Sequence, residues 1–209
     1  MKKLSLLFTK DGLQWHISKG KTVLEEAFYF VTEETSPHLV EEKLDDVLKF
    51  DDYKEIEVIS ALNHFSLTPD TFAEHELGYK LISYNAPVDE ANEELMLSVN
   101  KRFAVQFYYT FPKHFYQKIK AKKLPTKFNF SGEKFLNALT VKNHKEIHIN
   151  LYHHQVEFFA FENKKVVLYN NLDADSEVDF LYFIMFSLSK INFGTAETHF
   201  HIYGETHEN

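Results

Sequence analysis

The sequence contains no cysteine, and only six glycines and five prolines occur among its 209 residues. The absence of cysteine excludes disulfide bonds, thiol nucleophiles and zinc sites built on thiolates. So few glycines and prolines also exclude a linker-rich or low-complexity chain. The apolar run 4–8 is too short for a signal-peptide core, and the most apolar later stretch, 180–188, is too short for a membrane span. We therefore expect a soluble, globular protein of the cytoplasm with no transmembrane segment.

Positive charge is also scarce, because 23 lysines and arginines face 31 acidic residues and the formal net charge is −8. Nonspecific binding to nucleic acid depends on lysine and arginine displacing condensed counterions, so we expect no nucleic-acid partner. One lysine-rich stretch follows Pro112. We interpret it as the solvated face and C-terminal end of a helix, where cations suit the helix dipole. Its members are Lys113, Lys118, Lys120, Lys122, Lys123 and Lys127.

Aromatic side chains are abundant, with 21 phenylalanines and 11 tyrosines beside a single tryptophan. A chain with 44% hydrophobic residues can bury an adequate core, and bulky rings favour strands packed between layers. The runs 107–109 and 158–159 resemble platforms for stacking nucleic-acid bases. In an acidic chain they are better interpreted as core strands.

An internal repeat organises the chain. Apolar positions in residues 4–59 correspond to apolar positions 143 residues later, in 147–202. For example, Leu4 corresponds to Ile147 and Ile59 to Ile202. Each copy predicts a meander of three strands, then a helix and a fourth strand. The expected strands are 4–8, 13–18, 22–31 and 56–59 in the first copy, and 147–151, 156–161, 166–170 and 199–203 in the second.

The helices of the two copies differ in their patterns. The first, opened by Ser36 and Pro37, has one apolar and one acidic face up to about residue 50. The second follows the acidic run 173–179, whose carboxylates suit a capped helix start better than the metal ligands of a nuclease. Its core run, 178–191, is apolar nearly all round, which predicts a helix buried between two layers.

Residues 61–139 have no counterpart in the second copy, and we interpret them as the remainder of the first domain with an inserted subdomain. Thr68, Pro69 and Asp70 predict a capped helix that runs to about residue 81. Strands at 94–99 and 103–109, a helix after Pro112, a strand at 127–130 and a brief helix from Ser131 follow. The expected divisions of the chain are 1–67, 68–144 and 145–209.

Two copies of this order, with an insertion after the first, resemble the actin-like ATPase superfamily of actin, Hsp70 chaperones and sugar kinases. The middle segment looks like the cytoplasmic actin-like protein of type IV pilus assembly. The whole chain is similar to an uncharacterised bacterial family thought to share that fold, on the tracts 65–69, 179–183 and 202–205. The resemblance implies an α/β class with mixed α+β sheets and a duplicated actin-like or ribonuclease-H-like fold. It also implies a shortened second half, with a sheet face or edge near the C-terminus that is less protected.

The resemblance further implies a nucleotide cleft, with a phosphate-binding turn in each half and a glycine loop beneath the adenosine. The residues at these positions are Asp11 and Gly12 in the first turn, His153 and His154 in the second, and Gly204. The first turn is also an ordinary Asp-Gly hairpin, and the second has neither aspartate nor glycine. Glu205 would oppose a phosphate with its charge. We therefore expect a degenerate cleft and no cofactor, with ATP and magnesium as the alternative.

Histidines provide the other candidate chemistry. His148, His199 and His201 share one face if the first and last strands of the second copy lie side by side, because strand residues two apart point the same way. Such a face is a candidate metal site. No carboxylate is clearly placed to complete it, and polar outward faces commonly carry histidine.

Three hypotheses on function follow. The first is a non-catalytic or weakly nucleotide-responsive actin-like module that works as a scaffold, through a protein partner or self-association. The second is an ATP-binding ATPase or phosphotransferase that has rebuilt its loops with Asp11, His153 and Gly204. The third is a metal-dependent hydrolase that uses the strand histidines. We favour the first, a protein that is not an enzyme, because the repeated framework is preserved while the phosphate turns are eroded.

Overall fold

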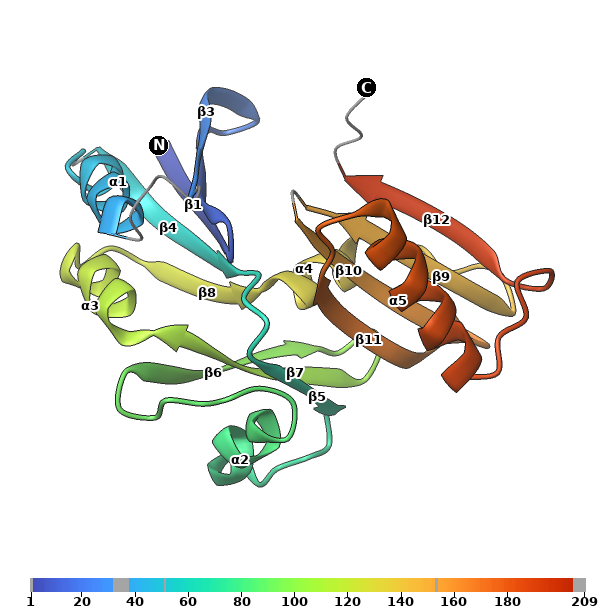
Figure 1. Ribbon diagram of the computed structural model, residues 1–209. Helices are drawn as coiled ribbons and strands as arrows, with labels where there is room; N and C mark the ends of the chain where they lie inside the picture. Colours follow the sequence, from blue (N-terminus) through green and yellow to red (C-terminus); the bar gives the residue numbers. More distant parts are fainter. Residues whose placement is uncertain (1, 32–37, 51, 153, 205–209) are drawn as a thin grey trace. The chain divides into compact units, whose positions relative to one another are not determined.

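The computed structural model describes residues 2–31, 38–50, 52–152 and 154–204, which belong to two compact units (Figure 1). The first unit comprises residues 1–99 and 104–133, and the second comprises residues 100–103 and 134–209. Both contain mixed sheets and helices, so the expected α/β class is confirmed. Within the described ranges, no helix is both long enough and apolar enough to cross a membrane.

The first unit is built on a five-stranded sheet with the order β3-β2-β1-β4-β8. Strands β1, β2 and β3 are antiparallel neighbours, whereas β4 runs parallel to both β1 and β8. The bounds are β1 Lys2–Thr9, β2 Gly12–Lys19, β3 Thr22–Phe30, β4 Tyr53–Ser60 and β8 Thr126–Phe130.

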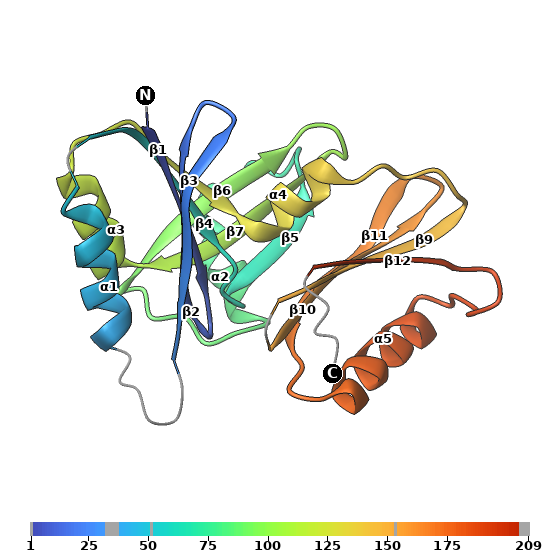
Figure 2. The same ribbon diagram turned by 90° about the horizontal axis from the view of Figure 1, so that it is seen from above.

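Two helices, α1 (His38–Leu48) and α3 (Lys113–Ala121), pack on this sheet and lie side by side in both views (Figures 1 and 2). Alternate β1 residues such as Leu4 and Leu6 are fully buried and join one apolar core with Leu44 of α1 and Ile119 of α3. Lys118 of α3 also lies within 2.9 Å of Glu41 and 2.6 Å of Asp45 on α1. At least one member of the lysine-rich stretch is therefore paired within the fold. The expected cap of α1 at Ser36 and Pro37 lies outside the described residues.

A three-stranded sheet, β5-β7-β6, completes the first unit together with α2 (Gly78–Ser83). Its strands are β5 Phe65–Pro69, β6 Glu93–Asn100 and β7 Val105–Pro112. The predicted helix start at Thr68, Pro69 and Asp70 is wrong. Thr68 and Pro69 pair with Gln106 and Val105 of β7, and the helical segment begins only at a 3-10 turn, His75–Leu77. An edge strand tolerates proline at its end, so pairing with β7 overrides the local helix-start signal.

The second unit is built on a four-stranded sheet with the order β11-β10-β9-β12. Its strands are β9 Lys145–Leu151, β10 Gln155–Glu162, β11 Lys165–Asp173 and β12 His199–Gly204, with β12 parallel to β9. The helix α4 (Ser131–Ala138) begins in the first unit and ends in the second. The helix α5 (Glu177–Lys190) covers one face of the four-stranded sheet (Figures 1 and 2).

The helix α5 is not buried between two layers, which corrects the prediction from its composition. Its inner side packs Ile184 and Leu188, 4% and 1% exposed, against Ile147 and Ile149 of β9. Its outer side leaves Val178 75% exposed. The predicted cap is confirmed, because the hydroxyl of Ser176 accepts a hydrogen bond from the Asp179 amide at 3.1 Å.

The two larger sheets share strand order and register. β1 pairs with β2 as β9 pairs with β10, and a register shift falls between Ile17 and Ser18 in one sheet and between Ala160 and Phe161 in the other. These positions are 143 residues apart, as an internal repeat requires. The last strand departs from that spacing. Ile202 pairs with Ile149 of β9, and the equivalent partner of Leu6 on β1 is Val58 of β4. Ile202 therefore corresponds to Val58 and not to Ile59. The duplication itself stays a prediction.

Candidate functional site

The first predicted phosphate turn, Asp11 and Gly12, lies between β1 and β2. Gly12 has φ +150°, and a Cβ atom there would overlap the carbonyl oxygen of Tyr29 on β3. The carbonyl of Asp11 accepts a hydrogen bond from the Val31 amide at 2.6 Å. The backbone of β3 therefore lies directly against this turn. Strand pairing alone is enough to explain why glycine stands at position 12.

The remaining nucleotide candidates belong to the second unit. His154 is exposed between β9 and β10, and its carbonyl accepts a hydrogen bond from the Ala174 amide at 3.0 Å. Gly204, at φ +102°, ends β12 opposite Leu151, whose backbone a Cβ atom would overlap. His153 and Glu205 lie outside the described residues. As at Gly12, a neighbouring strand explains the glycine at position 204.

A hollow of about 570 Å³ lies at the carboxyl end of β1, beside the first turn. Side chains from α1, α3 and the segments around them line it, and most of these side chains are apolar. The buried hydroxyl oxygen of Thr9 in its wall has no hydrogen-bond partner. The lining comprises Phe8, Thr9, Lys10, Gly12, Val31, His38, Val40, Glu41, Leu62, Pro112, His114 and Phe115.

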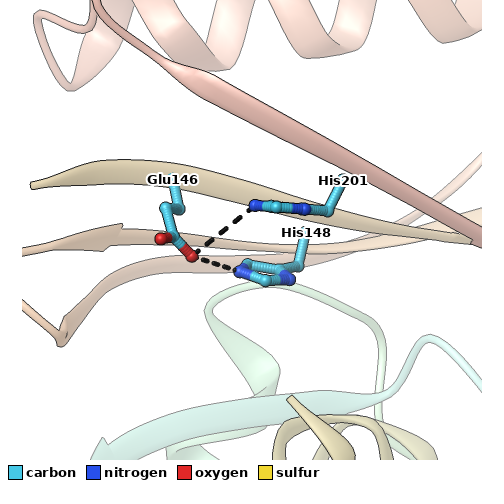
Figure 3. A group of neighbouring side chains, drawn as sticks. All are labelled: Glu146, His148 and His201. Carbon is cyan, nitrogen blue, oxygen red and sulfur yellow. Dashed lines mark hydrogen bonds and ion pairs between the residues drawn. The ribbon is translucent and has the colours of Figure 1, made fainter. Parts of the chain in front are cut away.

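Three titratable side chains meet on the face of the second sheet opposite α5 (Figure 3). Glu146 and His148 are two apart on β9 and point the same way, and the parallel register places His201 of β12 beside His148. His148 Nε2 lies 2.7 Å from Glu146 Oε2, and His201 Nε2 lies 3.8 Å from the same oxygen. The two imidazole rings stack with centroids 4.5 Å apart. One carboxylate oxygen is thus approached by two imidazole nitrogens.

Burial and hydrogen bonding together set the charge state of the Glu146–His148 pair, both members of which are 0% exposed. Burial raises the pKa of Glu146, but hydrogen bonds from the Asn143 amide, His148 and the Lys142 amide outweigh it and lower the pKa to about 2. Burial lowers the pKa of His148, and the hydrogen bond to Glu146 opposes this only in part. At neutral pH the pair is a carboxylate facing a neutral imidazole.

Neighbouring residues orient the Glu146 and His148 side chains through further hydrogen bonds. The other oxygen of Glu146, Oε1, accepts hydrogen bonds from the amides of Lys142 and Asn143 and from the side-chain nitrogen of Asn143. His148 Nδ1 lies 3.0 Å from the hydroxyl of Tyr203. The ring of Tyr203 in turn meets that of Phe135 edge to face at 5.5 Å. Both ends of the Glu146–His148 pair are therefore held in place.

The structure thus joins two of the three histidines proposed as metal ligands and adds a carboxylate. Ligand atoms of Glu146, His148 and His201 all lie within 4.8 Å of one another, and His199 is not a member of this group. The expectation that no carboxylate is clearly placed was wrong. So was the interpretation of an outward face, because His148 is fully buried. The missed signal was Glu146 two positions before His148, the same spacing that selected the histidines.

The outer side of α5 is an exposed apolar surface, which we name the α5 face. Its members follow helical spacing, and Tyr182 and Phe186 stack at 5.9 Å. They surround a shallow, open hollow of about 460 Å³. The α5 face comprises Val178, Leu181, Tyr182, Met185 and Phe186, all of which are exposed.

The neighbouring strand β12 adds further exposed apolar side chains. Phe200 and Ile202 pair with Ile147 and Ile149, so they point to the side of the sheet that α5 covers. Both are exposed, and β12 is an edge strand. This agrees with the expected lack of protection near the C-terminus.

Comparison with known proteins bears on the fold and on the family. A model for the family described as "Protein of unknown function (DUF3822)" matches residues 1–209. A search among curated proteins finds no match. One similar solved structure is a Bacteroides thetaiotaomicron protein with an actin-like ATPase fold and unknown function. It shares 20% identity with a TM-score of 0.81, over 99% of this chain and 83% of that one.

Two other similar structures belong to a secretion system and to a pilus biogenesis complex. The cytoplasmic domain of EpsL, an inner-membrane component of the Vibrio cholerae type II secretion system, is 10% identical with a TM-score of 0.56, over 100% of this chain and 84% of that one. A chain of the PilM–PilN type IV pilus biogenesis complex is 12% identical with a TM-score of 0.49, over 90% and 66%. The expected actin-like ATPase fold is confirmed, as is the resemblance to an uncharacterised family that has it.

Proposed function

The chain belongs to the DUF3822 family, and from this premise we propose that it is an actin-like scaffold module that does not hydrolyse ATP and associates through the α5 face. The observation on which this rests is the exposure of five large apolar side chains on one side of a single helix. Exposed apolar surfaces of this kind mark sites of protein contact.

The helix α5 has two apolar stripes. Ile184 and Leu188 on the inner stripe pack on the helix's own sheet. The outer stripe recurs at positions 178, 181, 182, 185 and 186, the spacing with which one helix packs against another. The sheet covers the inner stripe, whereas the five side chains of the outer stripe stay exposed among the described residues of the second unit. It is available to a helix of another chain.

Charge favours a second copy of this chain as the occupant. The outer stripe is centred on Tyr182, with acidic Glu177 and Asp179 toward its N-terminal end and Lys190 at its C-terminal end. Two α5 helices packed antiparallel would bring each acidic end against the lysine end of the other. The two helix dipoles would also be antiparallel. A twofold dimer repeats each such contact twice.

The nucleotide candidates support a function without ATP hydrolysis. Gly12 and Gly204 are each explained by close contact with a neighbouring strand. The second turn carries His153 and His154 in place of the aspartate and glycine of an active relative. The hollow beside the first turn has mostly apolar walls, which suit an apolar group better than a phosphate chain.

Sedimentation velocity over a range of protein concentrations tests the proposal. We expect a concentration-dependent dimer that Leu181→Asp converts to monomer, because the substitution places a charge within the α5 face. Tyr84→Asp, at an exposed apolar side chain of the first unit, is the control and should leave the dimer intact. A chain that stays monomeric at the highest concentrations contradicts self-association, and a dimer that persists in Leu181→Asp contradicts the assigned surface. Saturable thermal stabilisation by ATP and magnesium would overturn the non-hydrolytic assignment if hydrolysis accompanies it.

A further inference from the structure

His201 presents an unusual polar atom. Its Nε2 is buried and has no hydrogen-bond partner, although the rest of the side chain is partly exposed. It points toward Glu146 Oε2 at 3.8 Å, too far for a hydrogen bond. That oxygen is already hydrogen-bonded to Nε2 of His148, 2.7 Å away. A buried nitrogen without a partner costs free energy unless something binds it.

We propose that Glu146 Oε2, His148 Nε2 and His201 Nε2 bind one divalent transition-metal ion such as Zn²⁺. The site lies wholly within the second unit and is separate from the α5 face, on the opposite side of the sheet. It goes beyond the proposed scaffold function, and no reaction is assigned to it.

The distances suit such an ion. Zinc binds imidazole nitrogen and carboxylate oxygen at about 2.0–2.2 Å, so tetrahedral ligand atoms lie about 3.4 Å apart. The observed separations of 2.7 and 3.8 Å lie on either side of this value. Rotation of the partly exposed His201 ring out of its stack on His148, together with rotation of the Glu146 carboxylate, would direct all three atoms at one ion.

The chemistry of the set also suits a transition metal. Two imidazoles and one carboxylate are ligands that zinc and ferrous iron accept, whereas calcium and magnesium prefer oxygen alone. Three protein ligands leave a fourth position for water. The ion would give His201 Nε2 the partner that it lacks.

The surrounding contacts match those of a metal site. Metal-binding carboxylates are usually held by further hydrogen bonds, and Glu146 Oε1 accepts them from Lys142 and Asn143. The second ring N–H of a metal-binding histidine usually donates a hydrogen bond to an acceptor, and His148 Nδ1 faces the hydroxyl of Tyr203. When Nε2 binds the ion, the imidazole proton resides on Nδ1 and the Tyr203 oxygen accepts it. The hydrogen bonds that would support the two ligands Glu146 and His148 are therefore already present.

Calorimetric titration of the untagged full chain with Zn²⁺ tests the site, and the visible absorption of bound Co²⁺ reports its coordination geometry. We expect one equivalent of metal and an intense tetrahedral cobalt spectrum. His201→Ala should weaken binding by about 100-fold or more, since loss of even an outer contact costs about 10- to 100-fold. His199→Ala, two positions earlier on the same strand and outside the cluster, is the matched control and should bind like the wild type.

Three outcomes overturn the proposal. They are no binding of either metal, unchanged affinity in His201→Ala, and an equal loss in His199→Ala. The second outcome would assign any binding to other histidines of the chain. Glu146→Gln offers an independent check, because it keeps the shape of the side chain but removes the charged ligand. Its circular dichroism spectrum and melting temperature establish whether it folds, and a folded variant that keeps full affinity also contradicts the site.

Discussion

The hydroxyl of Tyr203 on β12 lies 3.0 Å from Nδ1 of His148 on β9, so an edge strand holds a buried imidazole by its outer nitrogen. Tyr203→Phe should therefore weaken zinc binding by about 10- to 100-fold while lowering the free energy of unfolding by only about 1 kcal/mol. Calorimetric titration and urea unfolding measure the two effects separately. A purely structural tyrosine would change stability without changing metal affinity.

The acidic and basic ends of α5 provide a test of antiparallel self-association. Lys190→Glu and Glu177→Lys should each raise the dissociation constant of the dimer about tenfold, since each contact occurs twice in a twofold pair. The double variant restores opposite charges across the interface and should bind within about threefold of the wild type. Sedimentation equilibrium measures all four proteins. A double variant weaker than both single variants would contradict the antiparallel arrangement.

The two sides of α5 should differ sharply in their contribution to folding. Leu188→Ala removes buried methyl groups from the core against β9 and should lower the free energy of unfolding by about 2–5 kcal/mol. Leu181→Ala, on the exposed side, should change it by less than about 0.5 kcal/mol. Denaturant unfolding at a concentration where the chain is monomeric gives both values. Similar losses at the two sites would mean that the α5 face is covered within the monomer.

Strand positions were predictable because the alternation of apolar residues in 4–8 and 147–151 is a local signal, and the register of antiparallel pairing follows once the hairpin turns are recognised. The segment at Thr68 was not, because its pairing with β7 depends on residues nearly forty positions away. Composition also could not separate a helix buried on all sides from one with two apolar stripes. In the histidine cluster, the spacing of Glu146 and His148 was visible, but their burial is a property of the folded sheet.

Alkaline pH should reveal the burial of Tyr53. Burial, with smaller effects from Asp52 and Glu25, raises the pKa of this phenol from about 10 to about 12. Between these values the Tyr53 phenol loses its proton in the unfolded chain but keeps it in the folded chain. Its contribution to the free energy of unfolding is therefore complete below pH 10 and is lost as the pH rises through 12. Tyr53→Phe should flatten this decline in unfolding measurements at several pH values.

Substitution of Gly12 and Gly204 tests whether these glycines are required by contact with a neighbouring strand or by phosphate binding. At each, φ is positive and a Cβ atom would overlap the backbone of the adjacent strand, Tyr29 in one case and Leu151 in the other. Gly12→Ala and Gly204→Ala should therefore each cost more than about 1 kcal/mol of stability, as alanine does where the native φ is unsuitable. Gly20→Ala is the control, because φ is also positive there but no atom lies within 4 Å of the added Cβ. It should cost less than either. If all three variants unfold at the same denaturant concentration, close strand contact is not the reason for the two glycines. Gly12 and Gly204 would then again be candidates for contact with a phosphate and with adenosine.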